Sequence, residues 1–489
     1  MTLSEKTLSE LPASIKKPEY NRGDLKVRMV HLGFGAFHRA HQAVYTDILS
    51  SDFSSDWGYC EVNLRKGEII DLLNSQDCLY TVNEMAHGKC DARVIGVIRQ
   101  ALCPAVDGMD AILDVLAQPE VAIVSLTITE KGYFYEPASG KLLIDNELIE
   151  NDILSNQPRT VPGILIEALR RRKRRGLPPF SVLSCDNIPE NGKLIKSVVL
   201  QLASLQKDDI SLWIKENVTF PSTMVDRIVP AMTNESTKMI ERQLENIKDD
   251  VAVVCEPFRQ WVIEDNFVNG RPEWEKAGAE LVKNVVPYEE MKLRMLNGSH
   301  SFLAYIGLLA GKKYIFECME DADLQRITRE FMLSQQAPTL SVANKNLKGY
   351  SEQLLSRFLN SDIKHKLSQI AMDGSLKLPQ RMLGSVRWHI ANHSDFSLLA
   401  LGIAAWMLYL GRLEVGQGIS DITDPFLDKI RDKIQNSRDG TERVQALLGL
   451  DSVFGLDLFN NNIFVKEVER NYLMLKENGV SRTIKSYIS

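Results

Sequence analysis

The sequence predicts an α/β domain followed by a mainly α-helical domain. Before about residue 285, short apolar runs alternate with helical segments, which is the pattern of parallel strands joined by crossover helices. Beyond that point strand signals nearly vanish, and one helical segment follows another. We therefore expect residues 1–285 of the 489-residue chain to form the first domain and residues 286–489 to form the second.

The first domain contains four runs that we interpret as buried strands. Each is short and mostly apolar, as expected for a parallel strand with both faces covered. The runs span residues 27–32, 59–64, 121–128 and 180–185, and helical segments at 108–116 and 163–174 lie among them. We interpret the basic block at 170–175 as the solvated end of a helix, where cations complement the helix dipole.

The second domain is expected to be built from helices. Helical patterns span residues 288–311, 321–335, 350–359 and 397–410. The most apolar stretch of the chain, residues 396–411, is shorter than the ~20 residues needed to cross a bilayer. We therefore interpret it as a buried core helix.

The composition excludes several classes of protein. The 58 Lys and Arg residues against 64 Asp and Glu give a net charge of −6, without the surplus of cations that nucleic-acid binding requires. An apolar fraction of 44% and a charged fraction of 25% are ordinary for a soluble globular protein. Seven cysteines with no C-x2-C pair, and a polar N-terminus without a signal segment, favour a reduced, cytoplasmic protein.

A glycine-rich turn follows the first predicted strand. Gly33 and Gly35 stand one residue apart between a strand and a helix, where they let backbone N–H groups approach a pyrophosphate. His38 occupies the place of the third glycine of the usual G-x-G-x-x-G pattern, so a plain strand-to-helix turn is the alternative. The order of strand, turn and helix favours a Rossmann-type, dinucleotide-binding domain. Its predicted cofactor-binding residues are Leu32, Gly33, Phe34, Gly35, Ala36, Phe37, His38 and Arg39.

Glu61 is the candidate for holding the adenosine ribose of the cofactor. It lies in the second strand run, somewhat further beyond Gly33 than the ~20 residues usually seen. A buried structural glutamate is an equal alternative at this position. NAD is the expected cofactor, but Arg65 and Lys66 follow closely and would suit the 2′-phosphate of NADP.

Two polar segments of the first domain are further candidates. The strand at 180–185 runs into Asp186 and Asn187, and polar groups at the carboxyl end of an α/β strand lie where ligands bind. Asp226 and Arg227 stand together inside an apolar segment. For this charged pair, a buried structural salt bridge is an even alternative to a functional role.

The strongest catalytic pattern lies at the start of the second domain. At 3.6 residues per turn, Lys292, Asn297 and His300 fall within an arc of roughly 140°, so one helix face can present all three. A lone lysine or histidine there would be an ordinary surface residue. Hydride transfer from an alcohol needs a base for the hydroxyl proton, and a desolvated lysine with a lowered pKa can be that base. An asparagine amide can hold the resulting oxyanion without a metal.

No metal is expected. His31, His38 and His41 form a histidine cluster in the sequence, but they lie in the predicted cofactor turn and no carboxylate joins them at ligand spacing. The cysteines also lack the spacing of zinc sites.

These segments together resemble the polyol-specific long-chain dehydrogenases, the mannitol dehydrogenase family. The resemblance runs from residue 27 to about residue 458. The family's K-x4-N-x2-H signature stands as Lys292, Asn297 and His300, and its turn G-x-G-x-F-H-R-x-H matches residues 33–41, His38 included. Three further motifs match: S-C-D-N at 184–187, M-V-D-R-I at 224–228 and M-D-G-S-x-K-x-P at 372–379.

The resemblance implies an NAD(H)-dependent, metal-independent secondary alcohol dehydrogenase. Lys292 would be the general base, and Asn187 and Asn297 would form the oxyanion site. His300 and Lys377 would bind substrate hydroxyls or a carboxylate, and Asp226 would face the substrate or the cofactor. Family members carry a Rossmann-type N-terminal domain and a mainly helical C-terminal domain, with the active site in the cleft between them.

Within the family, residues 256–267 and 291–305 look most like the branch that interconverts D-mannonate and D-fructuronate. A uronate carries a carboxylate that mannitol lacks, and Arg259, Lys377 or Arg294 could meet it. The alternatives are mannitol 2-dehydrogenase, tagaturonate reductase and, in a different class, a non-catalytic Rossmann-type binding protein. The expected partner is a small sugar acid or polyol, with no nucleic acid and no membrane; the sequence does not indicate an oligomeric state.

Overall fold

The computed structural model describes residues 1–65, 67–86, 88–136, 139–342, 346–413 and 422–488. The chain divides into two compact units, Met1–Val286 and Pro287–Ser489. Within the described ranges, the structure contains no helix with the length and apolar character that crossing a membrane requires.

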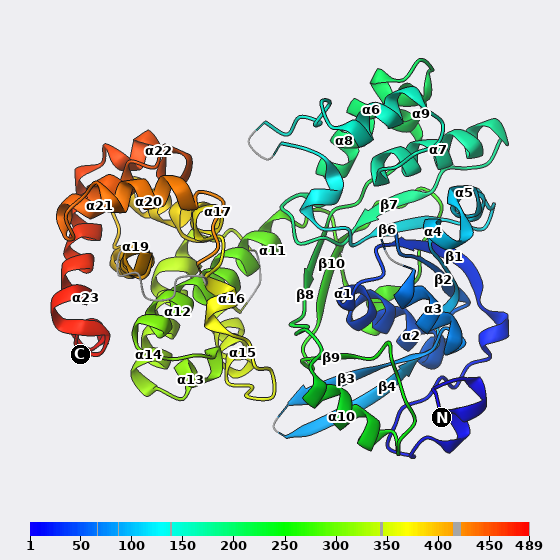
Figure 1. Ribbon diagram of the computed structural model, residues 1–489, viewed down its shortest axis with the longest axis horizontal. Helices are drawn as coiled ribbons and strands as arrows, with labels where there is room; N and C mark the ends of the chain where they lie inside the picture. The colour runs from blue at the N-terminus through cyan, green and yellow to red at the C-terminus, as the bar shows by residue number, and fades with distance from the viewer. Residues whose placement is uncertain (66, 87, 137–138, 343–345, 414–421, 489) are drawn as a thin grey trace. The chain divides into compact units, whose positions relative to one another are not determined.

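A five-stranded parallel sheet forms the centre of the first unit (Figure 1). Its order is β5-β2-β1-β6-β7, so β1 lies in the middle and the chain winds outward in both directions from it. The four apolar runs expected as strands correspond to β1, β2, β6 and β7. The strands are β1 (Lys26–Leu32), β2 (Trp57–Val62), β5 (Ile98–Leu102), β6 (Ile123–Leu126) and β7 (Ser181–Ser184).

Helices cover both faces of this sheet, because alternate side chains of β1 enter two different cores. One core includes residues of α5 (Met109–Leu116), α7 (Val161–Arg174) and α8 (Asn191–Leu205). The other includes residues of α2 (Gln42–Phe53) and α3 (Glu68–Ser75). A parallel sheet with both faces covered confirms the predicted α/β class of the first domain.

Two smaller sheets complete the first unit. One has the order β4-β3-β9 and the other the order β11-β10-β8. Their strands are β3 (Tyr80–Ala86), β4 (Lys89–Ile95), β8 (Thr223–Asp226), β9 (Val253–Cys255), β10 (Gln260–Glu264) and β11 (Glu280–Val282). The shorter helices of the unit are α1 (Ala36–Ala40), α4 (Pro104–Asp107), α6 (Glu147–Leu154), α9 (Ile210–Asn217) and α10 (Asn234–Gln243).

Helices build the second unit, as predicted. The expected core helix is α19 (Ser397–Leu410), which is buried on nearly every side. The segments before α19 are α11 (Val286–Met291), η5 (Lys292–Asn297), α12 (Gly298–Leu309), α13 (Ile315–Met319), α14 (Ala322–Glu330), η6 (Phe331–Gln336), α15 (Leu347–Phe358), α16 (Leu367–Ala371), α17 (Gly374–Leu378), η8 (Pro379–Leu383) and α18 (Gly384–Ala391). Those after it are α20 (Leu427–Gln435), α21 (Thr441–Leu448), α22 (Asp451–Phe459) and α23 (Asn462–Ile488).

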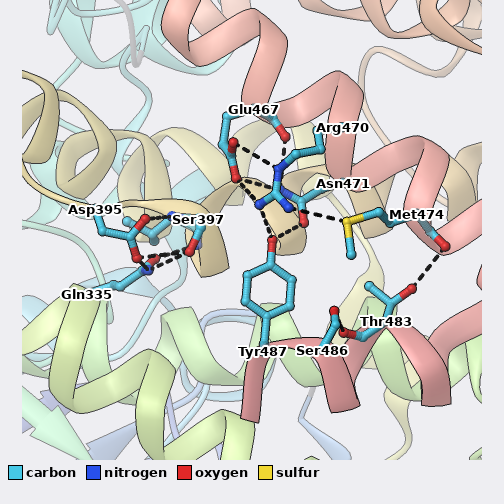
Figure 2. Close-up of polar contacts among 11 residues, drawn as sticks. Gln335, Asp395, Ser397, Glu467, Arg470, Asn471, Met474, Thr483, Ser486 and Tyr487 are labelled. Atoms are coloured by element: carbon cyan, nitrogen blue, oxygen red, sulfur yellow. Dashed lines mark hydrogen bonds and ion pairs between the residues drawn. The ribbon is translucent and has the colours of Figure 1, made fainter. Parts of the chain in front are cut away.

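The last helix, α23, is bent at Gly479, whose φ of 72° a residue with a side chain rarely adopts. Figure 2 shows the contacts that the bend allows. The hydroxyl of Tyr487 donates to Oδ1 of Asn471 at 2.6 Å and accepts from Nη2 of Arg470 at 2.7 Å. The final turns of the chain are therefore held back against the earlier part of the same helix.

Candidate active site

The glycine turn after β1 packs closely against the ends of the two neighbouring strands, β2 and β6. The N–H of Gly33 donates to the carbonyl of Val62 at the end of β2, at 2.8 Å. Gly33 has a φ of 109°, and a Cβ atom there would collide with the carbonyl oxygen of Thr127, just beyond β6. Only glycine satisfies both conditions, so the turn can pass this close to its neighbours.

A cavity of about 680 Å³ opens at this edge of the sheet. Gly33, Asn63 and Thr127 line it, and each directly follows the carboxyl end of a central strand. In an open α/β sheet, ligands bind outside the carboxyl ends of the strands at the point where the winding reverses, and β1 with its neighbours is that point here. The volume is in the range of small-molecule and cofactor pockets.

The predicted cofactor residues separate into two groups. Gly33, Phe34 and Gly35 line the cavity. None of the other predicted cofactor-binding residues is among the described residues that line the cavity. Leu32 is the buried end of β1, and Ala36, Phe37, His38 and Arg39 form the first turn of α1.

Arg39 contacts the backbone and a side chain of the glycine turn. Its guanidinium group donates to the carbonyl of Val251 and, at 3.4 Å, to the carbonyl of Gly35, and it lies 5.2 Å over the ring of Phe34. Burial lowers the pKa of this side chain. Since its donors bind backbone carbonyls, Arg39 positions the turn.

Glu61 lies beneath the turn and not in the cavity. Its side chain is 0% exposed, and its Oε1 is 2.9 Å from Nε2 of His38, which is also 0% exposed. This placement corresponds to the alternative that the sequence left open, in which Glu61 is a buried structural residue. The polar side chains that follow β2 and do line the cavity belong to Asn63, Arg65 and Glu68.

The histidine in the place of the third glycine is part of a buried stack. The rings of His31 and His38 lie face to face, with centroids 3.5 Å apart and an interplanar angle of 13°. Burial lowers the pKa of each imidazole to about 3 and raises the pKa of Glu61 to about 7. Both histidines are therefore neutral at pH 7. The hydrogen bond between His38 and Glu61 survives in either state of the carboxyl, because the neutral imidazole can donate or accept.

The same cluster corrects the expectation that no carboxylate joins the histidines. Ligand atoms of His31, His38 and Glu61 lie within 4.8 Å of one another. Both ring nitrogens of His31 nevertheless already have partners, Ser125 Oγ at 2.8 Å on Nδ1 and Thr127 Oγ1 at 2.9 Å on Nε2. Lone pairs of stacked, parallel rings also do not converge on one point, so the geometry fits a hydrogen-bonded cluster and not a tetrahedral metal site.

The carboxyl end of β7 brings further polar groups together. Asp186 accepts hydrogen bonds from the backbone N–H groups of Ile128 at 3.0 Å and Thr129 at 2.9 Å, and from the hydroxyl of Tyr133 at 2.7 Å. Burial raises the pKa of this carboxyl. Asp186 thus fixes the backbone from which the exposed Asn187 projects.

Asn191 joins this segment to β8, a role that the sequence did not indicate. Its amide nitrogen donates to the carbonyls of Asp186 and Thr223, each at 2.9 Å. Asp226 ends β8 and is buried. The adjacent Arg227 forms an ion pair with Glu84, in β3.

Arg259 lies at a different cavity of the first unit. This second cavity, of about 380 Å³, is also lined by Lys16, Arg93 and Glu84 and shares none of its described lining residues with the cavity at the glycine turn. The guanidinium carbon of Arg259 lies 5.1 Å over the ring of Tyr45.

Lys292 and Asn297 form the two ends of η5, which is a π-helix and not the α-helix that the sequence predicted. The N–H of Gly298 donates to the carbonyl of Leu293, five residues earlier. Residues five apart in such a segment lie about one turn apart, so Lys292 and Asn297 share a face more closely than in an α-helix. Lys292, Asn297 and His300 are all buried, with 8%, 9% and 7% of their surfaces exposed.

Close packing holds this segment in place. A Cβ atom at Gly298 would lie 2.8 Å from Nε2 of Gln336 and 3.1 Å from the carbonyl of Arg381, so glycine lets the helix approach both. Nη1 of Arg381 donates to the carbonyl of Asn297 at 3.2 Å and to Oγ of Ser301 at 3.0 Å. Gln336 and Arg381 were not among the predicted site residues.

His300 is surrounded by aromatic and basic groups. Its ring centroid lies 4.7 Å from that of Phe358 and 5.4 Å from that of His365. Burial, together with His365, Arg381 and nearby cations, holds the pKa of His300 well below its usual range. Its buried Nε2 has no hydrogen-bond partner among the described residues.

Lys377 lies on α17, and its charge contributes to lowering the pKa of His365. Burial and, secondly, Arg381 lower its pKa to about 8, opposed by Asp373 and Asp424. Its Nζ donates to the carbonyl of Ile370 at 3.3 Å. Arg294, by contrast, is committed elsewhere, because its Nη1 donates to the carbonyl of Thr339 at 2.6 Å.

This arrangement in the second unit combines an amine, an amide and an imidazole on one buried face. An amine can take the proton of a hydroxyl, and an amide N–H can stabilise the oxygen left behind. The first unit offers a separate cavity whose glycine turn permits close approach of a phosphate backbone.

Comparison with known proteins assigns both units of the chain to one family. The model of the mannitol dehydrogenase Rossmann domain matches residues 27–276, and that of the mannitol dehydrogenase C-terminal domain matches residues 284–476. Two Escherichia coli (strain K12) proteins are similar: the uncharacterized oxidoreductase YdfI, 53% identical over 98% of both chains, and D-mannonate oxidoreductase, 47% identical over 97% of this chain and 98% of the relative.

A solved structure is similar over the whole chain. It is mannitol 2-dehydrogenase of Pseudomonas fluorescens in a ternary complex with NAD and D-mannitol. It is 38% identical, with a TM-score of 0.85, and the match covers 100% of this chain and 99% of that chain. With both domain models matched in order and relatives similar along their full lengths, the chain belongs to the mannitol dehydrogenase family.

Proposed function

We propose that this member of the family is an NAD(H)-dependent, metal-independent secondary alcohol dehydrogenase that interconverts D-mannonate and D-fructuronate. The observation that carries the proposal is the buried group of Lys292, Asn297 and His300 on η5 and α12. The similarity to D-mannonate oxidoreductase, 47% over nearly the full chain, supports the choice of a sugar acid.

The residues of the first unit would hold the cofactor. Gly33, Phe34 and Gly35 line the cavity at the glycine turn, where the pyrophosphate of NAD would bind backbone N–H groups. The bound cofactor would supply the hydride acceptor for oxidation of the alcohol carbon and, in its reduced form, the hydride donor for reduction of the ketone. Asp226, at the end of β8, is proposed to face the substrate or the cofactor.

The residues of the second unit would carry the proton transfer. In the oxidation, Lys292 takes the proton of the hydroxyl group while the hydride leaves the carbon that carries this group. In the reduction, Lys292 returns a proton to the same oxygen. The amide of Asn297 is proposed to donate a hydrogen bond to the oxygen as its negative charge develops, and so is that of Asn187, which belongs to the first unit. His300 and Lys377 bind the substrate's hydroxyls or carboxylate.

Mannitol 2-dehydrogenase activity is the second candidate, favoured by the 38% identity and TM-score of 0.85 to the complex with D-mannitol. A tagaturonate reductase is a third candidate within the same chemistry. A non-catalytic binding protein is disfavoured, because each residue of the lysine, asparagine and histidine group is present and buried.

The test is a comparison of NADH oxidation with D-fructuronate, D-tagaturonate and D-fructose, each in the presence of a chelator. We expect the highest kcat/KM with D-fructuronate and no effect of the chelator. A clear preference for D-fructose would defeat the sugar-acid assignment while leaving the dehydrogenase chemistry standing. Parallel rates with NADPH test the cofactor, because Arg65 lines the cavity and would suit a 2′-phosphate.

A further inference from the structure

We propose that His365 determines the substrate class of this site by receiving the carboxylate of a sugar acid, together with His300 and Lys377. The inference rests on the proposed function and deepens it. It concerns a residue outside the lysine, asparagine and histidine signature, in the segment between α15 and α16.

The backbone of His365 is fixed independently of its side chain. Its carbonyl accepts from the N–H of Ile315 at 3.1 Å, and its N–H donates to the carbonyl of Ile363 at 2.7 Å. The next residue, Lys366, forms an antiparallel bridge with Tyr314. The imidazole is thus presented from a rigid segment, and replacing it removes a side chain without releasing the main chain.

The side chain of His365 leaves a polar atom for a ligand. Its ring meets that of His300 edge to face, at a centroid distance of 5.4 Å and an angle of 80°. Nδ1 of His365 and Nε2 of His300 are both buried and have no hydrogen-bond partner among the described residues. Burying a polar atom without a partner is costly, so two such atoms at one ring contact favour the binding of a ligand oxygen there.

The charge around these two rings favours an anion. The four largest electrostatic effects on His300 come from His365, Arg381, Arg357 and Lys292, all of them basic, and Lys377 acts on His365 in the same direction. The carboxylates near Lys377 are those of Asp373 and Asp424. Asp424 is already engaged, since it accepts from the N–H of Ser375 at 2.9 Å and from the hydroxyl of the same residue.

Two of the neighbouring cations, Lys292 and Arg381, have other tasks, and we assign the carboxylate to the imidazoles and Lys377. Lys292 is the proposed base, and Arg381 donates to the carbonyl of Asn297 and to Ser301. A carboxylate would accept from the imidazole N–H groups and from the ammonium of Lys377, which are charge-assisted hydrogen bonds. A neutral polyol would satisfy the same nitrogen atoms without the charge, and hence more weakly.

The experiment compares His365→Leu with His365→Asn, whose amide nitrogen can replace Nδ1 as a donor. We expect His365→Leu to raise KM for D-fructuronate roughly 10- to 100-fold, with kcat within about threefold and with a much smaller loss of kcat/KM for D-fructose. His365→Asn should recover much of the affinity. Lys366→Gln, which removes an exposed neighbouring cation, is the matched control and should leave KM unchanged.

Equal losses with D-fructuronate and D-fructose, or an unchanged KM, would overturn the role of His365. Calorimetric binding of D-gluconate, a sugar acid, separates this inference from the proposed function. If the wild-type protein does not reduce D-fructuronate, the proposed function fails. A D-gluconate affinity that falls in His365→Leu then still supports the carboxylate site, and an affinity that does not change overturns it.

Discussion

Nε2 of His38 lies 2.9 Å from Oε1 of Glu61, and both side chains are wholly buried beneath the glycine turn. This contact explains why a histidine can stand where dinucleotide-binding turns usually carry a third glycine. The histidine replaces the close helix–strand contact that glycine permits with a stacked ring and a hydrogen bond to β2. The cofactor turn therefore rests on a polar cluster that belongs to the protein interior.

Glu61→Gln should change how stability depends on pH. Burial raises the pKa of Glu61 from 4.5 to about 7, so its contribution to stability is fully present below pH 4.5 and is lost as pH rises through 7. Glutamine stays neutral and still has an oxygen and an amide for His38. The unfolding free energy of Glu61→Gln relative to wild type should therefore rise with pH across this window, as measured by urea denaturation. A constant difference would contradict the raised pKa.

The buried histidines should make the first unit sensitive to acid. Burial lowers the pKa of His31, His38 and His41 from 6.5 to about 3, so the stability that they contribute is present above pH 6.5 and is lost as pH falls toward 3. The unfolding free energy should fall over that range, as measured by the tryptophan fluorescence of the protein, to which the buried Trp261 and Trp274 of this unit contribute. His38→Gln should show a shallower slope.

Gly33→Ala should abolish cofactor binding. Its positive φ and the collision of a Cβ atom with the Thr127 carbonyl force the turn to move, at a cost of about 1–3 kcal/mol. Calorimetry should find no NADH binding. The matched control is Gly384→Ala, because nothing lies within 4 Å of a Cβ atom there and its backbone is helical. Normal NADH affinity in Gly33→Ala would show that the turn does not hold the cofactor.

Lys292→Ala should lower kcat by roughly 10²- to 10⁴-fold, since the reaction loses its base. NADH binding should stay nearly intact, because the glycine turn lies in the other unit. Adding a small primary amine should restore part of the rate. A loss of only a few-fold, or no response to the amine, would contradict the role of Lys292.

Lys377 should give substrate affinity a pH dependence. Its pKa is lowered to about 8, so it carries a charge below pH 8 and loses it above. KM for D-fructuronate should rise as pH increases through 8, and KM for D-fructose should not. In Lys377→Met, KM should be high already at low pH and flat through this range; a profile like that of the wild type would exclude Lys377 from carboxylate binding.

The parallel sheet could be predicted from sequence because its strands are buried on both faces. The run that became β1 is mostly apolar, and its end is marked by Gly33. The smaller sheets could not be predicted in the same way. β3 mixes polar and apolar residues without regular alternation. It pairs with β9, where Val82 lies opposite Val253, and no local pattern predicts so distant a partner.

The candidate site could be predicted only in part, for a similar reason. The spacing of Lys292, Asn297 and His300 placed them on one face. It did not predict the π-helical turn, which packs at Gly298 against residues far along the chain. His365 belongs to no sequence motif, and its ring contact with His300 and its buried Nδ1 atom identify it only in the structure. Side chains that act through tertiary contacts leave little trace in sequence spacing.

The π-helical turn of η5 limits how this site can change over evolutionary time. Rewinding residues 292–297 into an ordinary α-helix, with no residue removed, would rotate the residues before this turn by about 100° relative to the residues after it. The base would then leave the face of its partners although no residue of the site had been replaced. Among natural variants of this protein, the glycine at position 298, where the wide turn packs closely against its neighbours, should therefore be kept as strictly as the site residues themselves.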